Sequence, residues 1–159
     1  MDELLSILQN NARTSLEDLA RILGSTPDDI ARRIDEYEKS GAIRGYRTLL
    51  SDDLTAKSRV TAVIEVRGQP EREGGFDRIA RRIGGFPEVV NMYLMSGKYD
   101  LLLFVEGDSL RKVAGFVSRH LATLDGVLST GTHFMLKTYK EDGVLMEETD
   151  SDERLAVSP

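Results

Sequence analysis

The sequence predicts an α+β fold in two parts: an N-terminal winged-type helix-turn-helix domain, then a βαββαβ domain of the ferredoxin-like type. Residues 1–50 carry apolar side chains at helical spacing, separated by capping residues and glycines. In residues 59–140, strand and helix periodicities follow the order strand, helix, strand, strand, helix, strand. The chain has 159 residues, which is enough for two small domains.

Two helices are expected in the first half of residues 1–50. The first is indicated by apolar residues at helical spacing, namely Leu4, Leu5, Leu8 and Ala12. The second begins at Ser15, because Asp18 stands three residues later in a pattern that resembles a capping box. It ends at Gly24, since glycine tolerates the left-handed backbone found at many helix ends.

A third helix begins at Thr26. Pro27 suits the first helical position, where no amide hydrogen is needed, and Gly41 ends the helix. One face of this helix is apolar, formed by Ile30, Ile34 and Tyr37. Residues 43–50 look extended, and we expect a strand there.

The second and third helices are separated by only Gly24 and Ser25, a spacing typical of a helix-turn-helix. Ala20 provides a small residue where the helices cross, and Ile30 provides an apolar anchor in the second of them. An ordinary helical hairpin is the alternative. The pattern favours DNA binding over that alternative.

Residues 51–58 are polar and predict a linker. The elements expected after it are a strand at 60–66, a helix at 76–83, strands at 89–95 and 100–106, a helix from Ser109 to 121, and a strand at 127–139. In such a plait the two helices cover one face of the sheet. The other face needs cover from elsewhere, and a second subunit is the expected source.

Composition narrows the function classes. The chain has no cysteine and two histidines, so disulfides, thiolate chemistry and cysteine-based zinc sites are excluded. No nucleophile–base pair or metal cluster is evident, and we expect neither an enzyme nor a cofactor. The chain contains no apolar run of membrane-spanning length, and its first residues lack the basic stretch of a signal peptide. We therefore expect a cytoplasmic protein that does not bind membranes.

Charge is distributed unevenly along the chain. Residues 141–159 hold seven acids and one base, which accounts for the whole net charge of -6 and predicts an acidic C-terminal tail. The tail is either disordered or partly docked through apolar stretches such as residues 144–146. Residues 1–50 hold nine acids and seven bases, so the predicted DNA-binding part is not strongly basic.

Several colinear stretches resemble the Lrp/AsnC family of transcription regulators, also called feast/famine regulators. They are Asn11-Ala12-Arg13-Thr14-Ser15, Leu19-Ala20, Leu23-Gly24, Glu38-Lys39-Ser40-Gly41-Ala42-Ile43-Arg44-Gly45-Tyr46 and Ser96-Gly97-Lys98-Tyr99-Asp100. The resemblance covers residues 3–140. It implies an effector (RAM-type) domain that pairs its sheets in a homodimer and often assembles into an octamer. It also implies double-stranded DNA as a partner and an amino acid or related small molecule as effector.

The resemblance places the effector between subunits, near the turn at residues 96–99. The residues carried over to this site are Gly97, Lys98, Tyr99, Asp100, Ser129, Thr130 and Thr132. Asp100 can accept hydrogen bonds from an α-amino group, and turn amides can hold a carboxylate. Lys98 departs from an acidic residue common in the family. Hairpin chemistry is the alternative, with Gly97 supplying an unusual backbone angle and Asp100 a local hydrogen bond.

A recognition helix sends its N-terminal residues to base edges and its flanks to phosphates. The predicted DNA-binding residues are Ser25 and Thr26 for phosphates, Arg32 and Arg33 for groove or backbone, and Arg44 and Arg47 for flanking phosphates. Two acids, Asp28 and Asp29, stand at the start of this helix. We interpret them as capping residues, which offset the helix dipole, rather than as base contacts.

Two other functions remain open at this stage. One is a ligand-sensing protein that has lost DNA binding, which the acidic start of the third helix favours. The other is an enzyme like the siroheme decarboxylases, which resemble this family in fold and use histidine at a tetrapyrrole site. His133, on the last strand of the plait, is the residue that motivates it.

Overall fold

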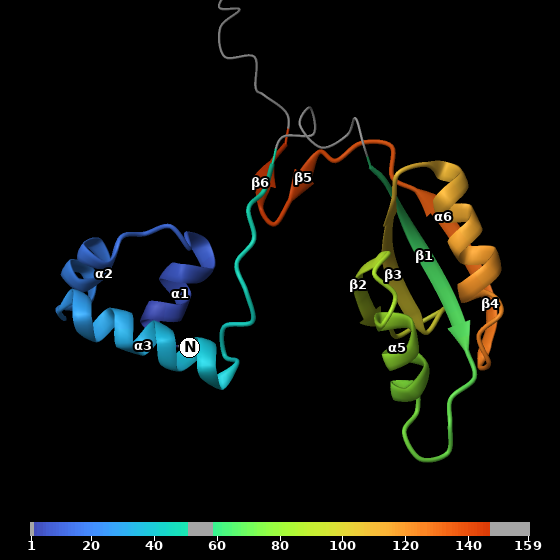
Figure 1. Cartoon of the computed structure of the whole chain (residues 1–159), viewed down its shortest axis with the longest axis horizontal. Helices are drawn as coiled ribbons and strands as arrows, with labels where there is room; N and C mark the ends of the chain where they lie inside the picture. Colours follow the sequence, from blue (N-terminus) through green and yellow to red (C-terminus); the bar gives the residue numbers. More distant parts are fainter. Residues whose placement is uncertain (1, 51–58, 147–159) are drawn as a thin grey trace, which may run out of the picture. The chain divides into compact units, whose positions relative to one another are not determined.

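A computed structural model of the chain describes residues 2–50 and 59–146, and it separates two compact units, Met1–Leu49 and Leu50–Pro159 (Figure 1). The predicted linker, residues 51–58, lies outside the described residues. The order of elements confirms the α+β prediction, with helices first and a βαββαβ plait second. Among the residues that the structure describes, no helix is both long and apolar enough to cross a membrane.

The first unit consists of three helices, α1 (Glu3–Asn10), α2 (Leu16–Leu23) and α3 (Pro27–Ser40). Each begins with a side-chain cap on a backbone amide, and the caps are Asp2, Ser15 and Thr26. Gly24 and Gly41 follow α2 and α3 with φ of 62° and 74°, the left-handed backbone that glycine adopts most readily. The predicted starts and stops of the second and third helices are therefore confirmed.

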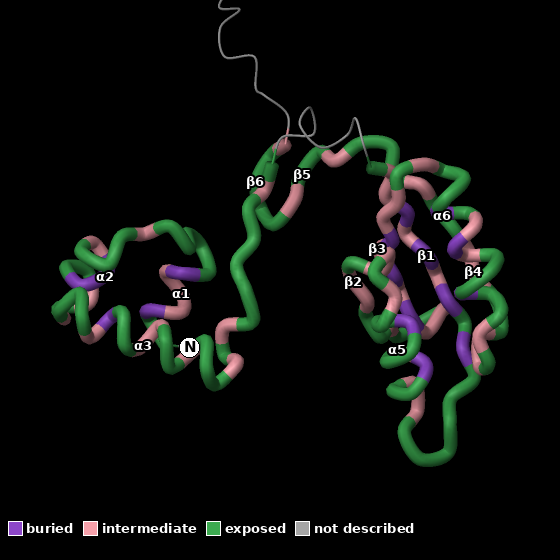
Figure 2. Tube along the Cα trace, viewed as in Figure 1, coloured by how far each residue is buried: buried purple, intermediate pink, exposed green. Residues whose placement is uncertain are grey.

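A small apolar core joins the three helices, formed by Leu4, Leu8, Leu19, Ala20 and Ile30. All five are buried, and Ile34 and Tyr37 pack at the margin. Figure 2 shows the buried segments of the three helices facing one another. The spacing of apolar residues predicted that Leu4, Leu8 and Ile30 share apolar helix faces, because side chains three and four positions apart lie on the same side of a helix.

The expected strand at residues 43–50 does not form, and Ala12 lies beyond the end of α1. A strand needs a neighbouring strand to receive its backbone hydrogen bonds, and the described residues around this segment in the first unit are helical. Ile43 instead donates its amide to the carbonyl oxygen of Tyr37 at 3.0 Å and packs against the helical core. The prediction that this segment is not helical is confirmed, and the prediction that it forms a strand is wrong.

The second unit contains a four-stranded antiparallel sheet and two helices. In chain order its elements are β1 (Val60–Gly68), α5 (Asp77–Gly84), β2 (Val89–Leu94), β3 (Leu101–Gly107), α6 (Leu110–Phe116) with a π-helical turn at Val117–Leu121, and β4 (Val127–Phe134). The strands lie in the order β2-β3-β1-β4, so β1 and β3 are central (Figure 1). This is the ferredoxin-like arrangement that the sequence predicted.

The two faces of this sheet differ. Ala62, Ile64 and Val66 of β1 are fully buried with alternate residues of β3, under residues of α5 and α6. The intervening residues point to the opposite side and stay partly exposed, among them Val63, Glu65, Leu102 and Phe104. We call this second side the open face.

β4 ends at Phe134, whereas the sequence predicted a strand as far as Tyr139. The reason lies in its partner: the amide of Met135 donates to the carbonyl of Thr61 at 2.9 Å, and β1 begins only one residue earlier. The chain then forms a separate hairpin, β5 (Lys140–Glu141) with β6 (Val144–Leu145). The predicted acidic tail therefore begins inside this hairpin, and residues 147–159 lie outside the described part of the chain.

Replacing Ile30 with alanine should destabilise the first unit. Ile30 is fully buried between helices, and large-to-small changes at such positions cost about 2–5 kcal/mol. Ile22→Ala is the matched control, because Ile22 is 57% exposed and the expected change there is under about 0.5 kcal/mol. Urea denaturation followed by circular dichroism measures both, and equal effects would show that Ile30 is not an anchor.

Candidate functional site

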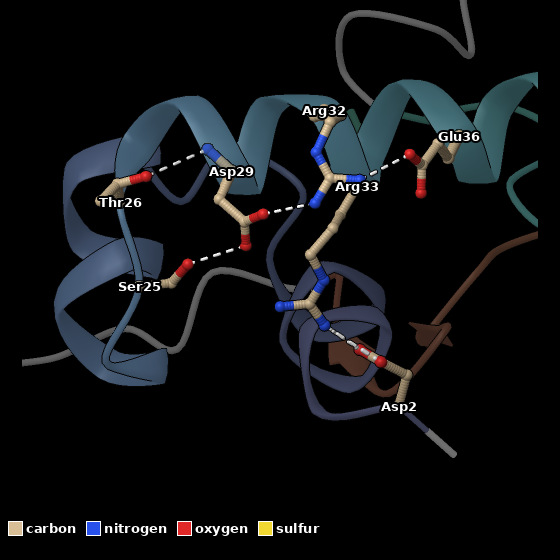
Figure 3. Close-up of polar contacts among 7 residues, drawn as sticks. All are labelled: Asp2, Ser25, Thr26, Asp29, Arg32, Arg33 and Glu36. Atoms are coloured by element: carbon tan, nitrogen blue, oxygen red, sulfur yellow. Dashed lines mark hydrogen bonds and ion pairs between the residues drawn. The ribbon is translucent and has the colours of Figure 1, made fainter.

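The turn before α3 and the first turn of that helix form one hydrogen-bonded group (Figure 3). The Ser25 hydroxyl donates to Oδ2 of Asp29 at 2.8 Å. The Asp29 amide donates to Oγ1 of Thr26 at 3.3 Å. Ser25 and Thr26, predicted as phosphate contacts, therefore serve the turn and the helix cap in the free protein. The interpretation of Asp29 as a residue of the cap agrees with this geometry.

Arg32 lies on the exposed side of α3, with its guanidinium between two carboxylates of the same helix (Figure 3). Its Nη2 donates to Oδ1 of Asp29 at 2.5 Å, and its Nη1 donates to Oε1 of Glu36 at 2.7 Å. The side chain remains 60% exposed. Hydrogen bonds from Arg32 and then from Ser25 lower the pKa of Asp29. The carboxylate is thus held ionised, and the arginine is held in one orientation.

Arg33 points toward the start of α1. Its Nη2 donates to both carboxylate oxygens of Asp2, at 3.1 and 3.0 Å, and the side chain is only 27% exposed. Asp2 also caps α1 through the amide of Leu4 at 2.8 Å. Arg33 therefore connects the third helix to the first, a contact that the sequence could not indicate because 31 positions separate the partners.

The remaining predicted DNA contacts, Arg44 and Arg47, are exposed and lie beyond the C-terminal end of α3. The guanidinium of Arg44 lies over Gly41. With a rise of about 1.5 Å per residue, α3 separates this end from Ser25 by roughly 20 Å. The structure thus brings Ser25, Thr26 and Arg32 together and places the other three arginines elsewhere on the unit.

The charge of α3 is negative overall. The helix contains five acids and three bases. Each base is engaged by a carboxylate, since Lys39 donates to Asp35 at 2.5 Å and the two arginines are paired as described. Attraction of this helix to phosphate is therefore weak unless ion pairs open.

The second predicted site is the turn between β2 and β3. Gly97 has φ of 136°, and the amide of Met95 donates to the carbonyl of Asp100 at 2.8 Å to close the turn. The Asp100 amide donates to Val66 at 2.9 Å, and Oδ2 of Asp100 accepts from the amide of Gly68 at 2.8 Å. The turn is therefore attached to the end of β1, with one carboxylate oxygen already used in that attachment.

The predicted residues of β4 do not share one face. Thr130 and Thr132 lie opposite Val66 and Ile64 of β1, on the side of the helices. Ser129 lies opposite Arg67 and therefore belongs to the open face. Thr130 and the turn lie on opposite sides of the same end of β1, about 10 Å apart across two strand spacings.

Other polar features lie apart from these residues. A surface cleft of about 460 Å³ beside α5 is lined by Glu71, Glu73, Arg78, Arg81 and Arg82, and it shares no residue with either predicted site. In the described part of the chain, no group of three His, Cys, Asp or Glu residues is arranged to hold a metal ion.

His133, the residue that raised the enzyme hypothesis, lies on the open face with Nε2 at 3.7 Å from Oε1 of Glu65. Both side chains are more than a third exposed. The pair is an exposed contact between neighbouring strands.

Comparison with known proteins agrees with both units. Residues 3–38 match the AsnC-type helix-turn-helix domain, and residues 61–145 match the Lrp/AsnC ligand binding domain. This chain belongs to the Lrp/AsnC family of transcriptional regulators. The Bacillus subtilis HTH-type transcriptional regulator YugG is 44% identical over 158 residues, spanning 99% of this chain and 95% of the relative.

Two further relatives place this Lrp/AsnC regulator in context. The leucine-responsive regulatory protein of Haemophilus influenzae is 29% identical over 147 residues, covering 91% of this chain and 86% of that protein. A transcriptional regulator of Neisseria meningitidis, solved as a complex with L-Met, has a TM-score of 0.69 and 25% identity over 91% of this chain and 96% of its own. These comparisons confirm a DNA-binding transcriptional regulator rather than an enzyme.

Acid should weaken the first unit partly through Asp29. Because its pKa is lowered by Arg32 and Ser25 in the folded protein, the ionised form favours folding. This contribution is present above the unfolded pKa of about 3.9 and is lost as the pH falls through the lower folded value. The free energy of unfolding of Asp29→Asn, from urea denaturation, should therefore fall less between about pH 5 and pH 2.

Arg32→Gln should show a similar reduction in acid sensitivity, because it removes the first of the two donors. Identical pH dependence in the unchanged protein and both variants would mean that this carboxylate contributes nothing to stability.

Proposed function

We propose that this regulator binds operator DNA as a homodimer that assembles further to an octamer, and that an amino acid bound between effector domains controls it. The observation that supports the effector site best is the attachment of the β2–β3 turn to the end of β1 beside Thr130. The names of the two relatives, one leucine-responsive and one bound to L-Met, support an amino acid as ligand. Because DNA is its partner, we place the protein in the cytoplasm.

For DNA, we assign the exposed side of α3 and its preceding turn to the major groove, as in other helix-turn-helix proteins. We assign Ser25 and Thr26 to phosphates at the start of the helix, and Arg32 to the groove. Arg33, Arg44 and Arg47 complete the proposed set at its flanks. Two helix-turn-helix domains linked in a dimer offset the weak DNA affinity of each one. Once the first domain is bound, the second contacts DNA at a high effective concentration.

For the effector, we assign Gly97, Lys98, Tyr99 and Asp100 of the turn and Ser129, Thr130 and Thr132 of β4. Oδ2 of Asp100 is engaged by Gly68, which leaves Oδ1 to accept from an α-amino group. Lys98 is exposed two residues earlier in the same turn, and its ammonium can pair with the effector carboxylate. Ser129 belongs to the open face, whereas Thr130 and Thr132 lie on the side of the helices. A ligand on one face of a single subunit therefore cannot contact all seven residues, and the proposed site draws its residues from two subunits.

Pairing of open faces is the proposed dimer contact. The face includes apolar side chains, among them Val63, Leu102 and Phe104, that remain only partly buried in one subunit. Phe104 packs edge to face on Tyr93, with ring centroids 6.2 Å apart. Burying these rings against a second copy removes apolar area from water, which is the main favourable term in such association.

Phe104→Glu should therefore convert the dimer to a monomer, because a carboxylate buried in an apolar interface costs several kcal/mol. The matched control is Leu110→Glu, at an exposed apolar position on α6 away from the open face. Sedimentation equilibrium measures the mass of each variant. This interface would be contradicted if Phe104→Glu had the same mass as the protein without substitutions, or if the protein without substitutions were itself a monomer.

A thermal-shift screen against the amino acids tests the effector proposal. A ligand at a hundred times its Kd stabilises the native state by about 2.7 kcal/mol. Asp100→Asn should abolish the shift, since an amide oxygen still accepts from Gly68 but the negative charge is lost. Asp125→Asn removes an exposed carboxylate outside the proposed site and should keep the shift. No stabilising amino acid, or full retention of the shift in Asp100→Asn, would count against this assignment.

A further inference from the structure

The adjacent arginines of α3 have different surroundings. Arg33 is held by Asp2, a residue of another segment, and most of its side chain is buried. Among the residues that the structure describes, the hydrogen-bond partners of Arg32 are carboxylates of its own helix, and most of its side chain is exposed. Opening the Arg33 pair would detach α3 from the cap of α1, whereas Arg32 can meet a ligand without disturbing the packing of the unit.

The contacts of Arg32 leave a usable pair of donors. A guanidinium carries five N–H groups, two on each terminal nitrogen and one on Nε. Asp29 takes one hydrogen bond from Nη2, and Glu36 takes one from Nη1. Each terminal nitrogen therefore keeps a second N–H, and the two carboxylates, one turn before and one turn after, hold the planar group in a single orientation (Figure 3).

We propose that Arg32 reads a guanine in the major groove, and that Asp29 and Glu36 are positioning residues that orient its guanidinium for this contact. The proposal rests on the proposed function, in which α3 enters the groove. Guanine presents two acceptors, N7 and O6, to a side chain in the major groove, and the paired donors of arginine match them. Holding the side chain before binding also reduces the conformational entropy that is lost on binding.

Electrostatics favour a base over a phosphate as the partner of Arg32. The two bound carboxylates outweigh the charge of the guanidinium, and the exposed Asp28 adds negative charge at the start of the helix. A phosphate placed at Arg32 would meet this net negative surface, whereas a guanine edge is neutral and is attracted through its acceptor atoms. The same carboxylates that weaken general DNA affinity thus favour sequence discrimination.

The test begins with selection of binding sites from a random double-stranded DNA library by the unchanged, full-length protein. Its best operator should contain a guanine, in each half-site, whose replacement weakens binding by about five- to 150-fold, the range of a bidentate contact. Arg32→Ala and Arg32→Lys should both lose this discrimination at that position alone. Arg32→Lys should retain more affinity for unrelated DNA, since it keeps the charge but not the planar fork.

Glu36→Gln tests the positioning role, and Asp35→Asn is its matched control. Both remove one exposed carboxylate from α3, and both release a cation, Arg32 in the first case and Lys39 in the second. Each should raise affinity for unrelated DNA at low salt, because repulsion of phosphate falls. Only Glu36→Gln should reduce the guanine preference, by at least about threefold, because the guanidinium is then less ordered. Asp29 is left unchanged because it also holds Ser25.

The outcomes separate the two levels of the proposal. An unchanged protein that enriches no sequence overturns the proposed function, and this inference with it. A selected operator whose base preferences survive in Arg32→Ala, or a uniform loss of affinity for all sequences in that variant, overturns only the assignment of Arg32 as the guanine reader. Equal guanine preference in Glu36→Gln and Asp35→Asn overturns the positioning role. Circular dichroism of each variant verifies that the helices are intact.

Discussion

The second unit depends on the central strand β1, which is bonded on both sides. Its buried side chains, Ala62, Ile64 and Val66, form the middle of the core beneath the helices. At its end, the carbonyl of Val66 accepts from the amide of Asp100 and the amide of Gly68 donates to the Asp100 carboxylate, while its beginning determines where β4 stops. The same strand therefore builds the core, positions the turn of the candidate effector site and limits the length of its neighbour. The residues between these buried ones lie on the open face, so the core and the proposed interface are on opposite faces of the same strand.

In the first unit, the contacts that order the arginine side chains also lower the attraction of α3 to DNA. Three carboxylates, Asp2, Asp29 and Glu36, engage the two arginines of α3. These contacts reduce the positive potential that draws a protein to DNA. They also fix where the side chains point, which matters more for reading bases than for holding phosphates. A dimer recovers DNA affinity because its second helix-turn-helix domain also binds. A recognition helix with little positive charge is therefore compatible with binding to specific operators.

Local signals allowed the helix ends to be predicted, because a cap or a terminal glycine acts within three or four residues. Ser15, Gly24 and Thr26 all occupy the roles expected of them. Two errors about strands, one predicted at residues 43–50 and one predicted to reach Tyr139, have the same cause. A strand exists only where a partner lies beside it, and the sequence pattern records side-chain alternation without recording where that partner ends.

The candidate sites, like the fold, were partly predictable from the sequence and partly decided by tertiary contacts. The sequence by itself determined the order of elements, the two apolar cores and the family, because periodicity and short motifs are properties of neighbouring residues. Only the tertiary structure decided which polar side chains meet: Arg33 with Asp2, and Asp100 with Gly68, more than thirty positions apart in each case. It also separated Ser129 from Thr130 and Thr132, through the register of β4 on β1. Such contacts depend on how distant segments pack, and packing is settled by burial of the whole apolar surface rather than by any local pattern.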